Sequence, residues 1–443
     1  MLRKKLSPVV SIFLMILGVM IIGGLLLKLP FAVQDGEYLS WDNAFFISSS
    51  AVCVTGLSPV TDLSLVLSPF GKVVLALLIQ IGGLGMVTIA IFALTLLGAK
   101  IGAWDRILVK EALNQNSNKG MVKLVLRIVM LTFIIELFGT ILNMIALWGE
   151  FPFWKNLGLS AFHAISSFNN CGFDLFGSSS LMLFENNYLL QISTMILIVL
   201  GGLGFIVISD ILENRRWSKL SIHSKIVLIM TTILIIVGMF GLKFSEGLLN
   251  ENFSWLDALF QSITLRTAGF YTIKLSSLNL LTIFIMMGFM FIGASPSSTG
   301  GGIKTTTLFV MFKSVSSFSF GKTAKVFDRK IGSESKIKAF TITCISMAVI
   351  FLFAIILLAI EQNNPNFTVS IENILFEVIS AFGTVGLSLG VTPYLSAISK
   401  ILLCFLMMFG RLGALTIFSL WNKNWNNPNS ENVGYLEEKM IIG

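Results

Sequence analysis

Four short stretches that each end in a glycine are the residues of this 443-residue chain best suited to chemistry. They are Val54-Thr55-Gly56, Asn170-Cys171-Gly172, Thr267-Ala268-Gly269 and Thr384-Val385-Gly386. Glycine permits positive backbone angles, so each stretch can turn successive carbonyl groups toward a common axis. A ring of backbone carbonyls replaces the hydration shell of a monovalent cation. The four stretches therefore predict a cation site that needs no charged side chain.

The spacing of these glycines indicates an internal repeat. They are separated by 116, 97 and 117 residues, and a second glycine-rich mark follows each of them. That mark is Gly82-Gly83-Leu84-Gly85, Gly201-Gly202-Leu203-Gly204, Gly300-Gly301-Gly302-Ile303 and Gly410-Arg411-Leu412-Gly413. Membrane helices also use glycine simply to pack closely. The glycine turn and the second glycine-rich mark nevertheless recur together four times at similar spacing, which favours a repeated structural unit.

The segment from Gly293 to Lys304 cannot be regular helix at low cost. It contains one proline and three consecutive glycines, which cost a helix about 3 and about 1 kcal/mol per residue. We therefore expect a loop inside the membrane, with a mere packing kink as the alternative. A phosphate-binding loop is excluded because Ile303 separates Gly302 from Lys304, so the GxxxxGK[ST] pattern is absent.

Two charged residues stand inside apolar runs. Arg411 lies in the run 401–420, where a central arginine costs a few kcal/mol and should face a cavity or a partner. It could repel cations and hydrogen-bond the loop 293–304, whose free carbonyls and the hydroxyls of Ser297, Ser298 and Thr299 can accept. Snorkelling to the membrane surface is the alternative. Glu136 also lies mid-span and could pair with a buried cation.

The composition excludes several classes of protein. Hydrophobic residues make up 55% and charged residues 12% of the chain, whereas a soluble protein carries roughly 25% charged residues. The chain therefore lies among membrane lipid. Its net charge of +8 gathers between apolar runs, so no nucleic-acid partner is expected. Two histidines exclude a histidine-based metal site or triad, and four cysteines without a CxxC pattern are expected to be free and buried.

The elements that must position these residues are long and short apolar runs. Runs of about 20 residues cross a bilayer, and runs of 10 to 14 are typical of re-entrant segments. The eight predicted spans are Ser7 to Leu27, Pro69 to Leu97, Met121 to Leu147, Tyr188 to Leu212, Ile222 to Leu242, Leu278 to Phe312, Ile337 to Ile360 and Pro393 to Leu420. The four predicted short helices are Trp41 to Cys53, Leu157 to Phe168, Trp255 to Leu265 and Ile371 to Phe382.

The fold class predicted from these runs is an all-α polytopic membrane protein, with eight transmembrane helices in four span, pore-helix and span repeats. Non-helical backbone at membrane depth must be buried or line water, so four re-entrant turns imply one central pore. The predicted repeats are 1–98, 99–213, 214–321 with the intramembrane loop 293–304, and 322–421, followed by a cytoplasmic tail, 422–443. Basic connections after every second span place both termini in the cytoplasm.

Essentially the whole chain resembles the membrane subunit, KtrB- or KtrD-like, of a Ktr-type potassium uptake system in the Trk, Ktr and HKT superfamily. The four glycine turns, the segment from Gly293 to Thr305 and the Phe-Gly-Arg-Leu-Gly run around Arg411 carry the resemblance. It implies four-fold pseudo-symmetry and a potassium filter around the four glycines. Superfamily members that favour sodium can carry serine at the first filter position, so Gly56 favours potassium.

The resemblance also implies a gate below the filter, a homodimer, a cytoplasmic KtrA- or KtrC-like nucleotide-binding ring and often sodium dependence. The expected gate residues are Gly293, Ser297, Ser298, Thr299, Gly300, Gly301, Gly302, Lys304 and Arg411. Every extramembrane piece is short, so no nucleotide is expected on this chain itself and control would arrive through the partner ring.

The predicted function is potassium-selective, channel-like uptake across the cell membrane, with sodium as a possible coupling ion and no enzymatic activity. One alternative is an alternating-access symporter of a small solute, because such transporters also use repeats and broken helices. Another is a membrane enzyme that modifies lipid, which would need paired carboxylates or histidines at one depth. The sequence offers no such cluster.

Overall fold

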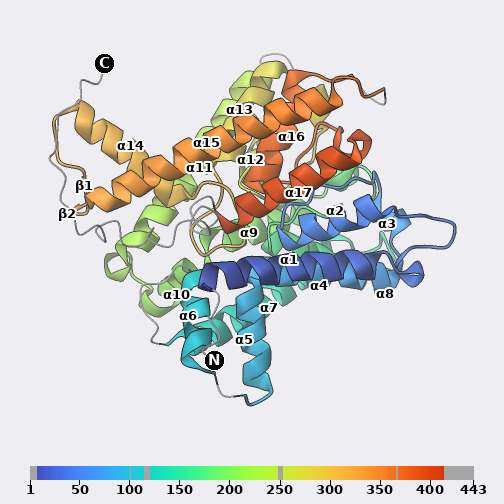
Figure 1. Ribbon diagram of the computed structural model, residues 1–443, viewed down its shortest axis with the longest axis horizontal. Coiled ribbons are helices and arrows are strands. Elements are labelled where there is room, and N and C mark those ends of the chain that lie inside the picture. The colour runs from blue at the N-terminus through green and yellow to red at the C-terminus, as the bar shows by residue number, and fades with distance from the viewer. Residues whose placement is uncertain (1–6, 100, 114–119, 248–252, 366–367, 414–443) are drawn as a thin grey trace, which may run out of the picture.

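The computed structural model describes residues 7–99, 101–113, 120–247, 253–365 and 368–413. This part of the chain is predominantly helical, with one small hairpin of β1 (Lys325–Val326) and β2 (Arg329–Lys330). The hairpin and the neighbouring α14 project at one end of the molecule (Figure 1). The predicted tail 422–443 lies outside the described residues.

Each predicted repeat begins with a long apolar helix. These helices are α1 (Pro8–Leu27), α7 (Met121–Ala146), α11 (Ile222–Gly247) and α15 (Ser333–Glu361). All four are long and apolar enough to cross a membrane. Their outward faces carry exposed apolar side chains such as Phe133 and Phe351, a pattern that lipid accommodates. The chain is therefore a multi-pass membrane protein. Cys344 on α15 is exposed on such a face and Cys404 is half-buried, which corrects the expectation that all four cysteines are buried.

A short helix follows each long one, close to where the sequence predicts it. The four are α2 (Trp41–Val52), α8 (Phe153–Phe168), α12 (Trp255–Thr264) and α16 (Ile371–Gly383). The hydroxyls of Ser40, Ser254 and Ser370 cap three of them by accepting a backbone N–H. Pro152 stands instead before α8, which begins four residues earlier than predicted. Each short helix ends just before its glycine turn.

The second helix of the first two repeats is broken, which corrects the predicted spans Pro69 to Leu97 and Tyr188 to Leu212. The first divides into α4 (Pro69–Leu84) and α5 (Met86–Leu96), bent by 101°, and the second into α9 (Tyr188–Leu203) and α10 (Phe205–Asn214), bent by 94°. The break falls on Gly85 and Gly204, at φ of +83° and +91° with extended ψ. Only glycine occupies that region readily, so it redirects the chain there.

The other two second helices stop in corresponding places. α13 (Leu280–Phe291) and α14 (Thr305–Ser319) are separated by the expected non-helical segment. α17 (Ala397–Leu412) ends at Gly413, whose φ is +84°, and the rest of the predicted span to Leu420 lies outside the described residues. The remaining helices are α3 (Leu63–Val66), α6 (Ala103–Ala112) and 3-10 turns at Pro30–Ala32, Ser180–Phe184, Trp217–Lys219, Leu275–Ser277 and Thr392–Tyr394.

The helices of the four predicted repeats pack in cyclic order. The second helix of each repeat contacts the short helix of the next: α4 packs on α8, α9 on α12, and α13 on α16. The last contact, α17 on α2, joins the end of the chain to its beginning. The largest hydrophobic core lies at this join and includes Phe46, Phe173 and Phe376. The short helices therefore converge on one centre.

Candidate cation site

The four glycine turns meet in a closed ring. A Cβ atom built on Gly56 would lie 1.9 Å from the carbonyl oxygen of Cys171, and one on Gly172 would lie 2.7 Å from that of Ala268. The ring continues from Gly269 to the Val385 oxygen at 2.7 Å, and from Gly386 to the Thr55 oxygen at 2.1 Å. Each glycine thus touches the backbone of the next turn in chain order. A side chain at any of the four positions would displace a neighbouring carbonyl.

The backbone of the turns follows one pattern. The residue two before each glycine is left-handed, with φ of +57° at Val54, +56° at Asn170, +73° at Thr267 and +51° at Thr384. Such angles are uncommon outside glycine and persist only where the surrounding structure imposes them. Together with the positive φ of each glycine, they give all four turns the same unusual course.

Hydrogen bonds fix each turn to the helix before it. The N–H groups of Thr55, Cys171 and Val385 donate to carbonyls of the last helical turn at 2.8 to 2.9 Å, and Ala268 does the same at 2.9 Å. The Ser50 hydroxyl also accepts from Gly56 N–H at 3.0 Å. The carboxyl ends of the four helices carry partial negative charge. Both features suit a site that holds a cation with backbone oxygens.

The loop 293–304 lies directly against the turns. Ile292 and Ile303 pair as a parallel bridge at its base. The Gly301 N–H donates to Thr384 Oγ1 at 3.0 Å, and Thr299 Oγ1 donates to the carbonyl at the end of α8, on Phe168, at 3.3 Å. The loop therefore touches the second and fourth repeats beside the ring.

The remaining expected gate residues stabilise the loop itself. The Lys304 ammonium donates to the Gly300 carbonyl at 2.7 Å. The hydroxyls of Ser297 and Ser298 donate to the carbonyls of Leu113 and Ser295 at 2.8 and 2.6 Å. Gly293 and Gly302 pack against each other, so that a Cβ on Gly302 would meet the Gly293 Cα at 3.1 Å.

Arg411 ties the loop to the first repeat. Its guanidinium donates to the carbonyls of Thr299 and Gly82, and to that of Gly83 at 3.2 Å. All three acceptors are backbone oxygens, whereas the expected serine and threonine hydroxyls bond elsewhere. The carbonyls near Gly82 and Gly83 are within reach because α4 ends at the following break. The Arg411 side chain, from the fourth predicted repeat, thus holds the loop of the third repeat to the first repeat.

Glu136 does not pair with a cation among the described residues. Its carboxylate, only 5% exposed, accepts from the side-chain amides of Gln80 at 3.1 Å and Asn169 at 2.9 Å. The Asn169 side-chain amide also donates to Gln80 Oε1 at 3.0 Å. Because Asn169 immediately precedes the second turn, this network supports the ring from behind.

A second link between the first and last repeats was missed from the sequence. The Lys400 ammonium, in a residue 6% exposed, lies 3.3 Å from Asp42 Oδ2 and donates to Asn43 Oδ1 at 2.8 Å. Asp42 and Asn43 lie in the first turn of α2, and Lys400 lies in the first turn of α17. The lysine inside the last apolar run was the sequence feature that could have indicated this link. Its partner could not be identified, because Asp42 lies 358 residues away in the chain.

Replacing Lys400 with methionine is expected to lower the thermal stability of the protein. The change leaves the Asp42 carboxylate and the Asn43 oxygen without their shared donor, at a cost of about 1–3 kcal/mol. Unfolding temperature in detergent measures the loss. Lys225→Met is the matched control, because this half-buried lysine donates only to the nearby Ser218 carbonyl, at 3.4 Å, and lies 5.5 Å from the centroid of the Phe327 ring, away from the link between Lys400 and α2. Equal stability of Lys400→Met and the parent would contradict a joining role.

Comparison with known proteins identifies the class of this site. Residues 13–432 match the family model TrkH, described as a cation transport protein. The chain is 38% identical to the potassium/sodium uptake protein NtpJ of Enterococcus hirae, over 100% of this chain and 98% of that protein. It is also 38% identical to the Ktr system potassium uptake protein B of Bacillus subtilis, over 96% and 94% of the two chains.

A solved structure shares the fold. The potassium transporter TrkH of Vibrio parahaemolyticus superposes with a TM-score of 0.72 at 19% identity, covering 96% of this chain and 87% of that one. The family model and the relatives at 38% identity each span nearly the whole chain. The chain therefore belongs to the TrkH family of cation transport proteins, which are transporters and not enzymes.

Proposed function

We propose that this protein carries potassium across the cell membrane through the ring of glycine turns. The observation that carries the proposal is the closed cycle in which each turn presents a carbonyl, of Thr55, Cys171, Ala268 or Val385, to the glycine of the preceding turn. Such oxygens can replace the water around a monovalent cation without binding it too tightly to leave. The filter comprises residues 54–56, 170–172, 267–269 and 384–386.

Potassium is the favoured ion for two reasons. All four turns carry glycine where they touch one another, so no side chain at these four positions displaces a carbonyl of the ring or adds a hydroxyl ligand there. Two relatives that span the chain are named for potassium uptake, and one of these names includes sodium. Sodium therefore enters the proposal as a possible coupling ion.

The proposed architecture is a central pore between four repeats, 1–98, 99–213, 214–321 and 322–421. The cyclic packing from α4 on α8 to α17 on α2 supports it. Both termini and the basic hairpin after α14 then face the cytoplasm, in keeping with the positive-inside rule. The second helices break on this inner side of the ring, where loop 293–304 acts as the gate and Arg411 holds it closed.

Uptake into proteoliposomes tests the proposed function. Purified protein should take up potassium and rubidium, with and without sodium, and should not carry small organic solutes. Transport of an organic solute with no potassium flux would favour an alternating-access symporter instead. Turnover of lipid by the protein in the same vesicles would instead favour a lipid-modifying enzyme, which membership of a transporter family argues against.

A cytoplasmic partner is expected to activate transport. We expect a homodimer of this chain on a KtrA- or KtrC-like nucleotide-binding ring. Two relatives are named as parts of a Ktr system, which supports association with other components of such a system. Adding such a ring to the proteoliposomes should raise potassium flux at least about fivefold, the lower end of ordinary allosteric coupling. The increase should depend on the nucleotide. Full nucleotide-responsive flux from the purified chain alone would show that no partner is needed.

A further inference from the structure

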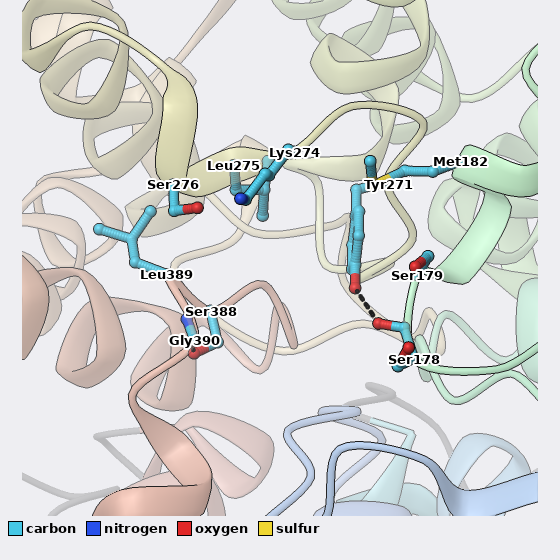
Figure 2. Close-up of a pocket in the computed structure, with 10 residues that line it drawn as sticks. All are labelled: Ser178, Ser179, Met182, Tyr271, Lys274, Leu275, Ser276, Ser388, Leu389 and Gly390. Carbon is cyan, nitrogen blue, oxygen red and sulfur yellow. Dashed lines mark hydrogen bonds between the residues drawn. The ribbon is translucent and has the colours of Figure 1, made fainter. Parts of the chain in front are cut away.

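A pocket of about 370 Å³ opens beside the ring, and no residue of loop 293–304 is among those that line it. It lies among the segments that follow the second, third and fourth glycine turns. Its lining residues are Ser178, Ser179, Met182, Tyr271, Lys274, Leu275, Ser276, Ser388, Leu389 and Gly390. Figure 2 shows these side chains around the opening, with the Tyr271 hydroxyl donating to the Ser178 carbonyl at 3.3 Å.

The pocket begins immediately outside the filter. Tyr271 and Ser388 each stand two residues after the filter glycine of their repeat, Gly269 and Gly386. A cation that approaches the ring from this side therefore passes the pocket first. Hydroxyl and carbonyl oxygens on its wall suit a cation that still keeps its water.

Lys274 is the single charged side chain among the lining residues. It is exposed, and its ammonium has no ion pair or hydrogen bond within the described part of the chain. In Figure 2 its nitrogen lies on the wall facing Leu389 and Ser388. The charge therefore stays uncompensated at the place where cations arrive.

The second repeat carries an acidic residue at the corresponding place after its glycine. Asp174 stands two residues after Gly172, in the position that Tyr271 and Ser388 occupy in their repeats. The ammonium of Lys274 thus stands against an acidic side chain that attracts cations toward the ring.

We propose that Lys274 is an electrostatic brake on cation entry, which sets the external potassium concentration needed for half-maximal uptake. The inference rests on the proposed function of the ring. A unit charge about 10 Å from a cation in water changes the local cation concentration about twofold. Salt screens this effect over about 10 Å at 0.1 M ionic strength. The brake should therefore be strongest in dilute solution.

Initial rates of potassium uptake against external potassium test the brake. At low ionic strength we expect KM to fall about twofold in Lys274→Gln and about fourfold in Lys274→Glu, with the maximal rate unchanged. The differences should shrink when N-methylglucamine sulfate raises the ionic strength. Lys155→Gln is the matched control, because this exposed lysine lies on the same side at the start of α8 but outside the pocket.

Charge can be separated from size by chemistry on Lys274→Cys. A positively charged methanethiosulfonate reagent should restore the KM of the parent, a negatively charged one should lower KM further, and a neutral one should leave it unchanged. The parent protein, with its own cysteines, controls for other sites. The same KM in every variant, or shifts that ignore the sign of charge, would overturn the brake alone. A parent without potassium uptake would overturn the proposed function and the brake together.

Discussion

Replacing Gly386 with serine is expected to lower the preference for potassium over sodium about tenfold or more, while the protein still reaches the membrane. A Cβ atom there would lie 2.1 Å from the Thr55 carbonyl oxygen and 3.2 Å from the Gly56 Cα. Both neighbours are backbone, so no flexible side chain can move aside. The Thr55 carbonyl must leave its place in the ring.

Backbone strain at position 386 adds to this steric clash with Thr55. The φ of Gly386 is +91°, in a region where a residue with a side chain costs about 1–3 kcal/mol. Each 1.4 kcal/mol that appears as a difference in binding between two ions is about tenfold in preference. Gly269→Ser should act in the same direction, because its Cβ would lie 2.7 Å from the Val385 oxygen.

Gly149→Ser controls for backbone strain alone. Gly149 has nearly the same angle, +89°, but a Cβ on it would meet nothing within 4 Å. Rubidium uptake in competition with potassium and with sodium gives the preference of each variant, and membrane yield shows whether it folds. Unchanged preference in both Gly386→Ser and Gly269→Ser would remove the ring from the conduction path.

Replacing Arg411 with alanine is expected to raise potassium flux about tenfold. The guanidinium holds the Thr299 carbonyl of the loop to the carbonyls of Gly82 and Gly83. Hydrogen bonds to charged groups contribute about 1.5–3 kcal/mol each, so loss of this bridge removes a large share of what keeps the loop in place. The change also removes a positive charge from beside the cation path.

Two further variants separate these causes. Arg411→Lys keeps the charge but loses the planar fork, so it should give an intermediate flux if bridging matters. Deleting Gly301 and Gly302 shortens the loop and should raise flux even with Arg411 present. Arg127→Ala is the matched control, because Arg127 pairs with Glu213 away from the loop. If Arg411→Ala and the shortened loop fold yet transport no faster than the parent, loop 293–304 is structural.

Local chemistry explains what could be predicted from the sequence. The glycines at 56, 172, 269 and 386 carry a backbone requirement that no other residue meets easily, and they recur in register. Pro296 and three glycines exclude helix in the third repeat on local cost alone. The short helices follow from the length of their apolar runs, which are too short to cross a bilayer.

The missed features depend on contacts between distant segments. Gly85 and Gly204 are compatible with a straight, closely packed helix, and only their surroundings select the extended angle that bends the chain. The link between Lys400 and Asp42 spans almost the whole sequence. Arg411 donates to the carbonyls of Gly82 and Gly83, which are free acceptors only because α4 ends there. The sequence pattern of one repeat does not show which residues of the other repeats will contact it.

Anomalous diffraction from crystals of this protein grown in rubidium or thallium tests the filter most directly. We expect a peak on the axis of the ring, within coordinating distance of the carbonyl oxygens of Thr55, Cys171, Ala268 and Val385. The peak should weaken when potassium is added in excess and in crystals of Gly386→Ser. Protein that transports rubidium but shows its bound ion elsewhere, with none at the four turns, would contradict the proposed filter.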